Sequence, residues 1–144
     1  MSEVESYEVR PIGTVRSSLT RREDAPRQGS EGAPEAWIEL RDDFRDGLLG
    51  VEPGRELLLV TWLHRSERDV LQVRPHHDPQ RTLKGVFVTR SPDRPNPIGL
   101  HPVTVLEVDG CRLRVVPLEA IDGTPVLDIK VATRADGRCP EPSR

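Results

Sequence analysis

The segment from Gly85 to Leu100, GVFVTRSPDRPNPIGL, carries the residues whose types and spacing best suit ligand binding. Its three prolines fix φ and restrict the residues before them, so the segment has few conformations. A rigid segment loses little entropy when a ligand binds. The polar side chains set among the prolines are Arg90, Ser91, Asp93, Arg94 and Asn96. We therefore expect a ligand-binding segment here, and the alternative is a stiff connector with solvated charges.

Three further segments combine polar side chains with turn or loop residues. They are Pro26-Arg27-Gln28, His64-Arg65 and Asp122-Gly123-Thr124-Pro125. The first lies in a long polar loop, the second follows an apolar run, and the third is a good turn sequence. Taken singly, each also fits a bland interpretation: a flexible surface loop, a structural histidine, or a solvated turn.

Other chemistries lack their motifs. The sequence has no nucleophile elbow, no phosphate-binding loop and no H-E-x-x-H zinc motif. His76-His77-Asp78 does not predict a metal site, because adjacent histidines on an extended chain point in opposite directions. Cys111 and Cys139 form no disulfide framework or ligand cluster. The chemistry is therefore expected to lie in a bound cofactor that the protein holds and orients.

Strands dominate the elements that must position these residues. The expected strands are Tyr7–Val15, Ala36–Leu40, Arg55–His64, Val103–Val108, Cys111–Val116 and Val126–Val131. The nearly continuous apolar run of Arg55–His64 indicates burial on both faces. Asp109-Gly110 between two apolar runs predicts a β-hairpin, with charged Arg112 and Arg114 on one face of its second arm. One short helix is expected over Asp42–Leu49, with Asp42 as N-cap and Gly50 as its stop.

The strand-dominated pattern predicts a mainly β fold, and the length predicts about one domain. We expect a small single-domain β-barrel with short helices and long loops. The absence of βαβ alternation and of a glycine-rich turn opening a helix argues against a Rossmann fold. We expect one domain over residues 1–135 and a polar tail over 136–144. The net charge of −3 argues against a broad basic surface for nucleic acid. Hydrophobic residues make up 35% of the chain, so the core is expected to be modest in size. A second subunit would bury additional apolar surface and so add stability.

No signal peptide is expected, because the acidic start MSEVESYEVR lacks an apolar stretch. The longest apolar run, Leu57–Leu63, is too short to span a bilayer. A cytoplasmic protein is the simplest expectation.

The motifs GVFVTRSPDRPNPIGL and IDGTPVLDIK together resemble the TsaA-like family, also called YaeB, VirR or TrmO proteins. PIGTVRS, PRQG and WLHR fit the same pattern in the same order, so the resemblance covers roughly Pro11 to Lys130. It implies an S-adenosylmethionine-dependent methyltransferase built on a small β-barrel, acting as a homodimer with the cofactor near the subunit interface. The activity it implies is N6-methylation of N6-threonylcarbamoyladenosine beside the anticodon of threonine tRNAs.

The resemblance also implies roles for the residues singled out above. The cofactor would be held by Pro26, Arg27, Gln28, His64, Arg65, Arg90, Leu100, Asp122, Gly123, Thr124 and Pro125. Arg94 and Asn96 would face the substrate or shape the pocket. No catalytic base can be named, and neither metal nor membrane is expected. Bacterial TrmO proteins carry an additional C-terminal domain thought to help hold tRNA, whereas this sequence ends at Arg144. A small-molecule methyltransferase and a non-catalytic cofactor-binding module therefore remain as alternatives.

Overall fold

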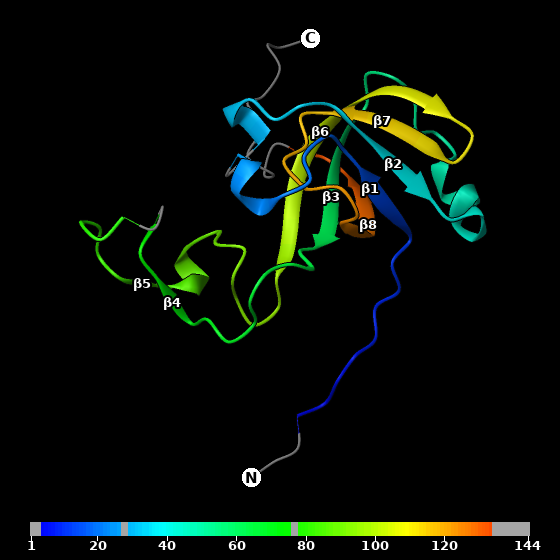
Figure 1. The fold of residues 1–144 in the computed structure, drawn as a ribbon. Helices are drawn as coiled ribbons and strands as arrows, with labels where there is room; N and C mark the ends of the chain where they lie inside the picture. The colour runs from blue at the N-terminus through cyan, green and yellow to red at the C-terminus, as the bar shows by residue number, and fades with distance from the viewer. Residues whose placement is uncertain (1–3, 27–28, 76–77, 134–144) are drawn as a thin grey trace.

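A computed structural model describes residues 4–26, 29–75 and 78–133. Six antiparallel strands close into a barrel in the order β1-β2-β7-β6-β3-β8 (Figure 1). They are β1 (Gly13–Arg16), β2 (Ala36–Leu40), β3 (Glu56–Trp62), β6 (Ile98–Asp109), β7 (Arg112–Val116) and β8 (Pro125–Val131). The expected small β-barrel fold is confirmed.

The remaining elements are short. Four 3-10 helices are described: η1 (Arg22–Asp24), η2 (Gly29–Glu31), η3 (Asp42–Leu48) and η5 (Val86–Val88). Strands β4 (Gln72–Val73) and β5 (Lys84–Gly85) form a separate two-stranded sheet. Among the described residues, no helix has the length and apolar character needed to cross a membrane.

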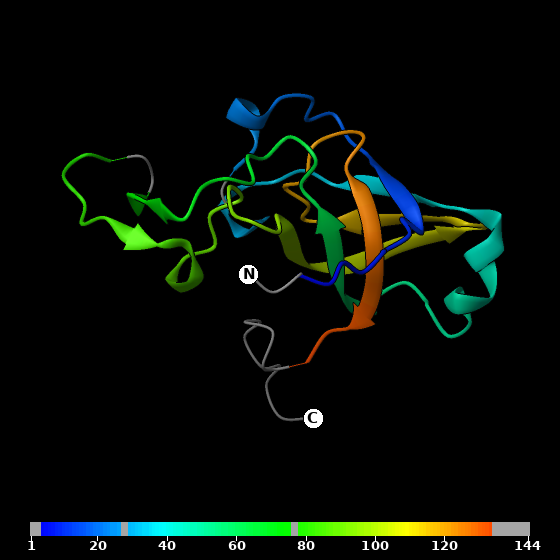
Figure 2. The same ribbon diagram turned by 90° about the horizontal axis from the view of Figure 1, so that it is seen from below.

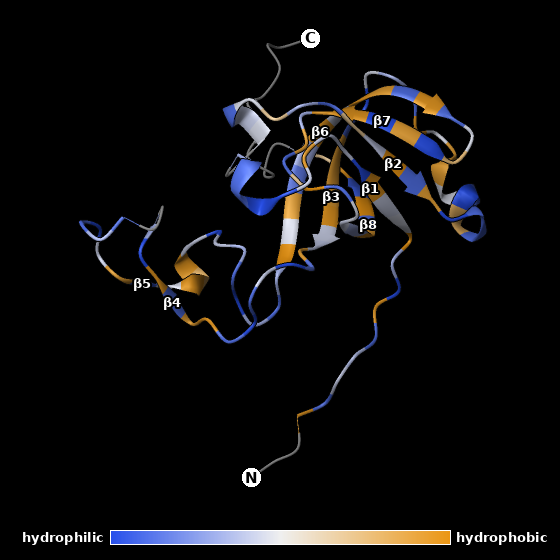
Figure 3. Cartoon of the chain, in the orientation of Figure 1, coloured by the Kyte–Doolittle hydropathy of each residue, from blue (hydrophilic) through white to orange (hydrophobic). Residues whose placement is uncertain are grey.

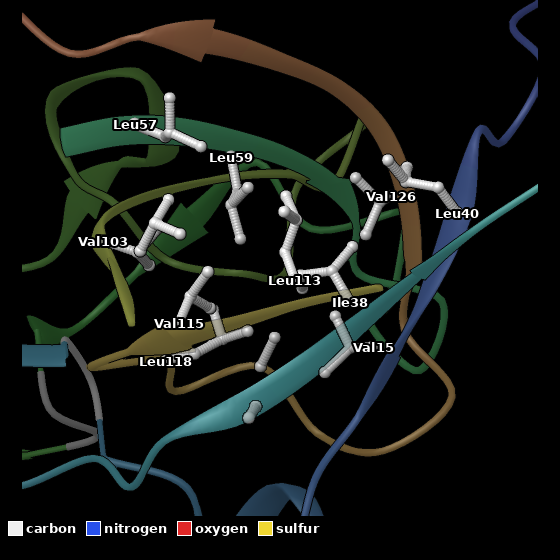
Figure 4. Close-up of a cluster of buried hydrophobic side chains, with 13 residues drawn as sticks. Val15, Ile38, Leu40, Leu57, Leu59, Val103, Leu113, Val115, Leu118 and Val126 are labelled. Atoms are coloured by element: carbon white, nitrogen blue, oxygen red, sulfur yellow. The ribbon is translucent and has the colours of Figure 1, made fainter. Parts of the chain in front are cut away.

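The core fills the barrel with aliphatic side chains from inward-facing strand positions, several of which are labelled in Figure 4. Because successive side chains on a strand point to opposite faces, alternate residues of each strand enter the core. The core residues are Val15, Ala36, Ile38, Leu40, Leu57, Leu59, Val103, Val105, Leu113, Val115, Leu118, Ala120 and Val126.

The expectation that β3 is buried on both faces was wrong. Leu57, Leu59 and Thr61 point inward and are buried, whereas Leu58 and Val60 are only partly covered. A closed barrel gives each strand one core face, so the outward apolar side chains of β3 remain at the surface. The apolar run in the sequence of β3 therefore reflects a core-facing side and an apolar side on the outer surface of the barrel.

The expected hairpin is present, but its turn lies one residue later than predicted. Asp109 still pairs with Arg112, so Gly110 and Cys111 form the two-residue loop. Gly110 has a φ of 61°, which glycine adopts without strain. Further from the turn, an irregularity in the pairing between Val105 and Glu107 changes the register of the hairpin by one residue. The alternation of Leu113 and Val115 inward with Arg112 and Arg114 outward is confirmed.

Two other predicted elements differ in extent. The first strand begins at Gly13, not Tyr7, because Pro11 cannot donate a ladder hydrogen bond, and Tyr7 and Val9 are exposed. The segment that begins at Asp42 is a 3-10 helix whose N-cap is Arg41, without a side-chain cap, so Asp42 is not the N-cap.

Much of the chain between β3 and β6 projects away from the barrel, and its described residues, 66–75 and 78–97, are called the arm here. Figures 1 and 2 both place the arm and the loop of η1 and η2 at one end of the barrel, with η3 at the opposite end. The end nearest the arm, where β3 ends at Trp62 and β6 begins at Ile98, is called the site end.

Candidate functional site

The Asp122–Pro125 turn closes the barrel at the site end, beside His64. The imidazole Nε2 of His64 lies 4.0 Å from the position that a Cβ would take on Gly123. Two predicted segments, separated by almost 60 residues of sequence, therefore lie side by side. The connection arises because β3 and β8 are neighbours in the barrel, with Thr61 opposite Val126.

Backbone hydrogen bonds hold this turn rigidly. The N–H of Asp122 donates to the Leu19 carbonyl at 2.7 Å, and that of Gly123 donates to the Val15 carbonyl at 2.8 Å. The N–H of Thr124 donates within the turn, to the Ile121 carbonyl at 3.2 Å. All three N–H groups thus already have hydrogen-bond partners within the protein. The turn therefore presents only its carboxylate and carbonyl acceptors to a ligand.

Asp122 also fixes the start of the long first loop. One of its carboxylate oxygens, Oδ1, accepts a hydrogen bond from the Ser17 N–H at 3.0 Å. The loop that leads to Pro26 is therefore attached to the turn from its first residues. Pro26 itself is half-buried, and Arg27 and Gln28 lie outside the described residues.

The base of the arm is tied to the same loop through Arg22. Its Nη1 donates to the Arg65 carbonyl at 3.1 Å, and its Nη2 reaches both carboxylate oxygens of Asp93, at 3.1 and 3.2 Å. Asp93 also accepts the Glu67 N–H at 2.9 Å. Three predicted segments, the first loop, His64-Arg65 and the proline-rich segment, are therefore joined at the site end.

The proline-rich segment contains both a loop and the start of a strand. Ile98, Gly99 and Leu100 belong to β6 and pair with Trp62, Thr61 and Val60 of β3. Leu100 points outward and is 45% exposed. All of Gly85–Leu100 was expected to be a stiff loop, whereas β6 already begins at Ile98.

Arg94 and Asn96 are engaged within the protein. The guanidinium of Arg94 donates to the carbonyls of Val86, Thr89 and Ser91 at 2.8–3.1 Å. The amide oxygen of Asn96 accepts from Arg68, which also stacks over the Trp62 ring at 5.0 Å. Both residues therefore shape the segment in this structure.

Arg90 differs from Arg94. It is exposed, and no hydrogen bond or ion pair of its guanidinium is found within the described part of the chain. It lies on the arm, just after η5. Its side chain is thus available to a ligand or to a second molecule.

Electrostatics keeps His64 neutral near pH 7. Desolvation lowers its pKa from the ordinary value of 6.5, and the positive charge of Arg65 lowers the pKa further. A neutral imidazole has one ring nitrogen free to accept a proton or a hydrogen bond.

A group of polar side chains inside the barrel was missed by the sequence analysis. His101 contacts Thr61 through Nε2 at 2.7 Å and Glu119 through Nδ1 at 2.8 Å. A histidine at an inward position of a predicted strand was a signal that could have revealed it. Its partners could not be predicted, because they come from two distant segments.

Two hollows flank the barrel. One, of about 230 Å³, lies on the outer face and is lined by Val9, Pro11, Trp62, Pro125 and Leu127. A larger one, of about 590 Å³, is lined by η3 and the ends of β3 and β8 far from the site end. Only the first includes a predicted site residue, Pro125. Within the described ranges, no three His, Cys, Asp or Glu side chains are grouped to bind a metal ion.

Comparison with curated proteins finds close relatives. The chain is 44% identical over 122 residues to an S-adenosyl-L-methionine-binding protein of Archaeoglobus fulgidus, covering 85% of this chain and 86% of that protein. It is 45% identical over 130 residues to a probable S-adenosyl-L-methionine-binding protein of Methanothermobacter thermautotrophicus, covering 90% and 92%.

Solved structures show the same fold. A crystal structure of TrmO from Pseudomonas aeruginosa matches 98% of this chain with a TM-score of 0.75 and 28% identity. The chain spans only 62% of that protein's length. The family model described as the tRNA-methyltransferase O N-terminal domain matches residues 14–136. The chain therefore belongs to the family of the tRNA-methyltransferase O N-terminal domain.

Proposed function

We propose that this protein is an S-adenosylmethionine-dependent methyltransferase that methylates N6 of N6-threonylcarbamoyladenosine beside the anticodon of threonine tRNA. Family membership and the names of the relatives support the cofactor and the reaction type. The observation that carries the proposal is the meeting of separate polar segments at the site end. His64 lies beside the turn at Gly123, and Arg22 joins Arg65 to the proline-rich segment.

The residues present fit this cofactor. The turn offers only acceptors, namely its carbonyls and the second carboxylate oxygen of Asp122, which suit the amino group of adenine or the ribose hydroxyls. Arg65 and Arg90 are exposed cations that suit the methionine carboxylate. Pro26, Leu100 and Pro125 supply apolar surface. S-adenosylmethionine, when bound, supplies a methyl group already activated by its sulfonium.

The protein's own task is then to orient the acceptor and to take up its proton. His64 is our candidate proton acceptor. It lies beside the turn, and its lowered pKa leaves a ring nitrogen free to accept a proton at pH 7. Arg94 and the proline-rich segment hold the neighbouring wall in place.

We propose that the protein works as a homodimer formed through the apolar outer face of β3 and β6. This face is defined by the cross-strand pairs Leu58–Pro102, Val60–Leu100 and Trp62–Ile98. Ile98 and Leu100 are each 45% exposed, which leaves adjoining apolar surface uncovered beside the site end.

The arm carries further exposed apolar side chains. Phe87 is 81% exposed and Val88 is 74% exposed, and Figure 3 shows η5 as a hydrophobic element on the arm. A second copy that covers this surface would bring the arm, with Arg90, to a neighbouring site end.

Methyl transfer tests the proposed function. Labelled S-adenosylmethionine is incubated with tRNA that carries threonylcarbamoyladenosine but lacks the methyl group. We expect transfer by the wild-type protein and a large loss in His64→Gln. Absence of transfer, while the cofactor still binds, would contradict the enzymatic proposal.

A small-molecule acceptor is the second candidate. The net charge of −3 favours it, because tRNA binding relies on cationic contacts to phosphate. Transfer to a small-molecule extract but not to tRNA would select it. Cofactor binding without transfer to either would select a non-catalytic binding module.

A further inference from the structure

The barrel core is polar at one place only within the described residues, and that place is the site end. Three polar side chains are buried in the described part: Thr61, His101 and Thr124. Thr61 and His101 contact each other, and Thr124 closes the candidate turn by donating to the Ile121 carbonyl at 2.7 Å. A buried polar group must find a partner or cost free energy, so such a cluster needs a reason.

Glu119 accepts a hydrogen bond from His101, so Thr61, His101 and Glu119 form a cluster that joins three segments of the chain. Thr61 lies on β3, three residues before His64, and His101 lies on β6, next to Leu100. Glu119 lies between β7 and β8, three residues before Asp122. Each member is thus close in sequence to a residue of the candidate site. The Thr61–His101–Glu119 network is the name used for this cluster below.

The hydrogen bonds have a consistent direction. An ionised Glu119 has only acceptors, so Nδ1 of His101 carries a hydrogen and donates it to Oε1 at 2.8 Å. In the neutral ring Nε2 then accepts the hydrogen of the Thr61 hydroxyl at 2.7 Å. Every ring nitrogen is satisfied in this arrangement, which fixes the ring orientation.

Gly99 makes room for the network. A Cβ on Gly99 would lie 2.6 Å from both His101 Nε2 and Thr61 Oγ1. Any side chain there would displace the contact between the two residues. Position 99 therefore needs a glycine, because only a residue without a side chain leaves space for the contact between His101 and Thr61.

The order hydroxyl, imidazole, carboxylate is that of nucleophilic catalysts. Thr61 is 0% exposed and His101 is 4% exposed, so no substrate reaches the hydroxyl. The network cannot act on a ligand directly. Its position between the segments suits a positioning role instead.

We propose that the Thr61–His101–Glu119 network holds the three segments of the candidate site in register. His101 and Thr61 fix the start of β6 against the end of β3, and Glu119 fixes the chain that leads into the Asp122–Pro125 turn. The three are positioning residues for ligand binding at the site end, an inference that rests on the proposed function.

A matched set of variants separates positioning from stability. Thr61→Val keeps the shape of the side chain but removes the hydroxyl, whereas Thr61→Ser keeps the hydroxyl and loses a methyl group. Val115→Ala removes core volume on β7 and leaves the network intact. Calorimetric titration with S-adenosylhomocysteine is done at a temperature where all variants are folded.

We expect Thr61→Val to bind at least about tenfold more weakly, the size of effect expected from losing one buried hydrogen bond. Thr61→Ser and Val115→Ala should retain affinity within about twofold, although both lose stability. Equal loss of affinity in Thr61→Val and Val115→Ala, or no loss in Thr61→Val, would overturn the positioning role.

Hydrogen exchange tests the network without the cofactor. We expect the amides of residues 98–101 and 119–124 to exchange faster in Thr61→Val than in Thr61→Ser. Equal exchange rates would overturn the proposal. If the wild-type chain binds no S-adenosylhomocysteine, the cofactor claim fails alone, and this exchange result still decides the role of the network.

Discussion

At the scale of single residues, two arginines four positions apart in one motif have different environments. Arg94 is half-buried and donates to three backbone carbonyls, whereas Arg90 is exposed. Residue type does not distinguish them, since each is an arginine in a proline-rich segment, and only the family resemblance implied different roles. The structure therefore separates a residue that holds the segment from one that is available to a ligand.

We predict opposite effects for substitutions of these two residues. Arg94→Met should lower the free energy of unfolding by about 1.5–3 kcal/mol, because it leaves carbonyls without their charged donor. Arg90→Ala should leave the unfolding free energy nearly unchanged and weaken cofactor binding. Denaturant melts and calorimetric titration measure the two quantities. A stable Arg94→Met protein would show that the three hydrogen bonds contribute little.

His64 gives a prediction about pH. Its folded-state pKa is lowered by desolvation and by Arg65, so the folded protein binds a proton less readily than the unfolded chain. The stability linked to His64 is then fully present above pH 6.5 and is lost as the pH falls through the lowered pKa. NMR titration of the ring should give a midpoint below 6.5.

Two variants serve as controls for that titration. Arg65→Gln should raise the midpoint only partly, because desolvation, the larger cause, remains. His64→Gln should remove this part of the pH dependence of stability. A wild-type midpoint at or above 6.5 would show that the ring is not desolvated as described.

Sequence reasoning located the candidate segments but not the contacts among them. It identified His64 and the Asp122–Pro125 turn, which the barrel brings together. It did not find Arg22, Thr61, His101 or Glu119. Those residues interact only through strand order and loop closure, which no local pattern in the sequence specifies.

At the scale of elements, the arm is anchored mainly at its base. Asp93 receives two hydrogen bonds from Arg22 and one from the Glu67 amide, and Arg68 donates to the Pro95 carbonyl at 2.7 Å. Strands β4 and β5 form only a small sheet of their own, apart from the barrel. The orientation of the arm therefore depends on these few side-chain contacts.

We predict that Asp93→Ala frees the arm without unfolding the barrel. The variant should become sensitive to limited proteolysis within residues 66–97, while its thermal transition changes little. Asp128→Ala is the control, because this carboxylate is exposed on β8 and contacts Lys130 outside the arm. Equal proteolysis of both variants would indicate that the Arg22–Asp93 contact does not hold the arm.

Most strands could be predicted, because alternation and turn residues are local signals. Ala36–Leu40 was predicted to the residue. The start of β6 within the proline-rich segment was missed, since Pro95 and Pro97 mask a strand that begins immediately after them. The irregularity in strand pairing between Val105 and Glu107 also has no local signature in the sequence.

At the scale of the whole molecule, the barrel leaves its apolar outer face next to the candidate site. A dimer formed through this face would link cofactor binding to assembly. We predict that Ile98→Glu converts a dimer into a monomer in analytical ultracentrifugation, because it places a charge within the interface.

Leu49→Glu is the matched control for this experiment. Leu49 is a leucine 95% exposed after η3, at the opposite end of the barrel. It should leave the dimer intact. A wild-type protein that sediments at the 16.2 kDa monomer mass at all concentrations would contradict the dimer.

The central claim is that the site end binds S-adenosylmethionine, and calorimetric titration with S-adenosylhomocysteine tests it most directly. We expect saturable binding of one molecule per chain, weakened by Arg90→Ala and unchanged by Leu49→Glu. No binding by the folded wild-type protein up to about 1 mM ligand, where even a weak site would be half occupied, would rule out a cofactor site at this end of the barrel.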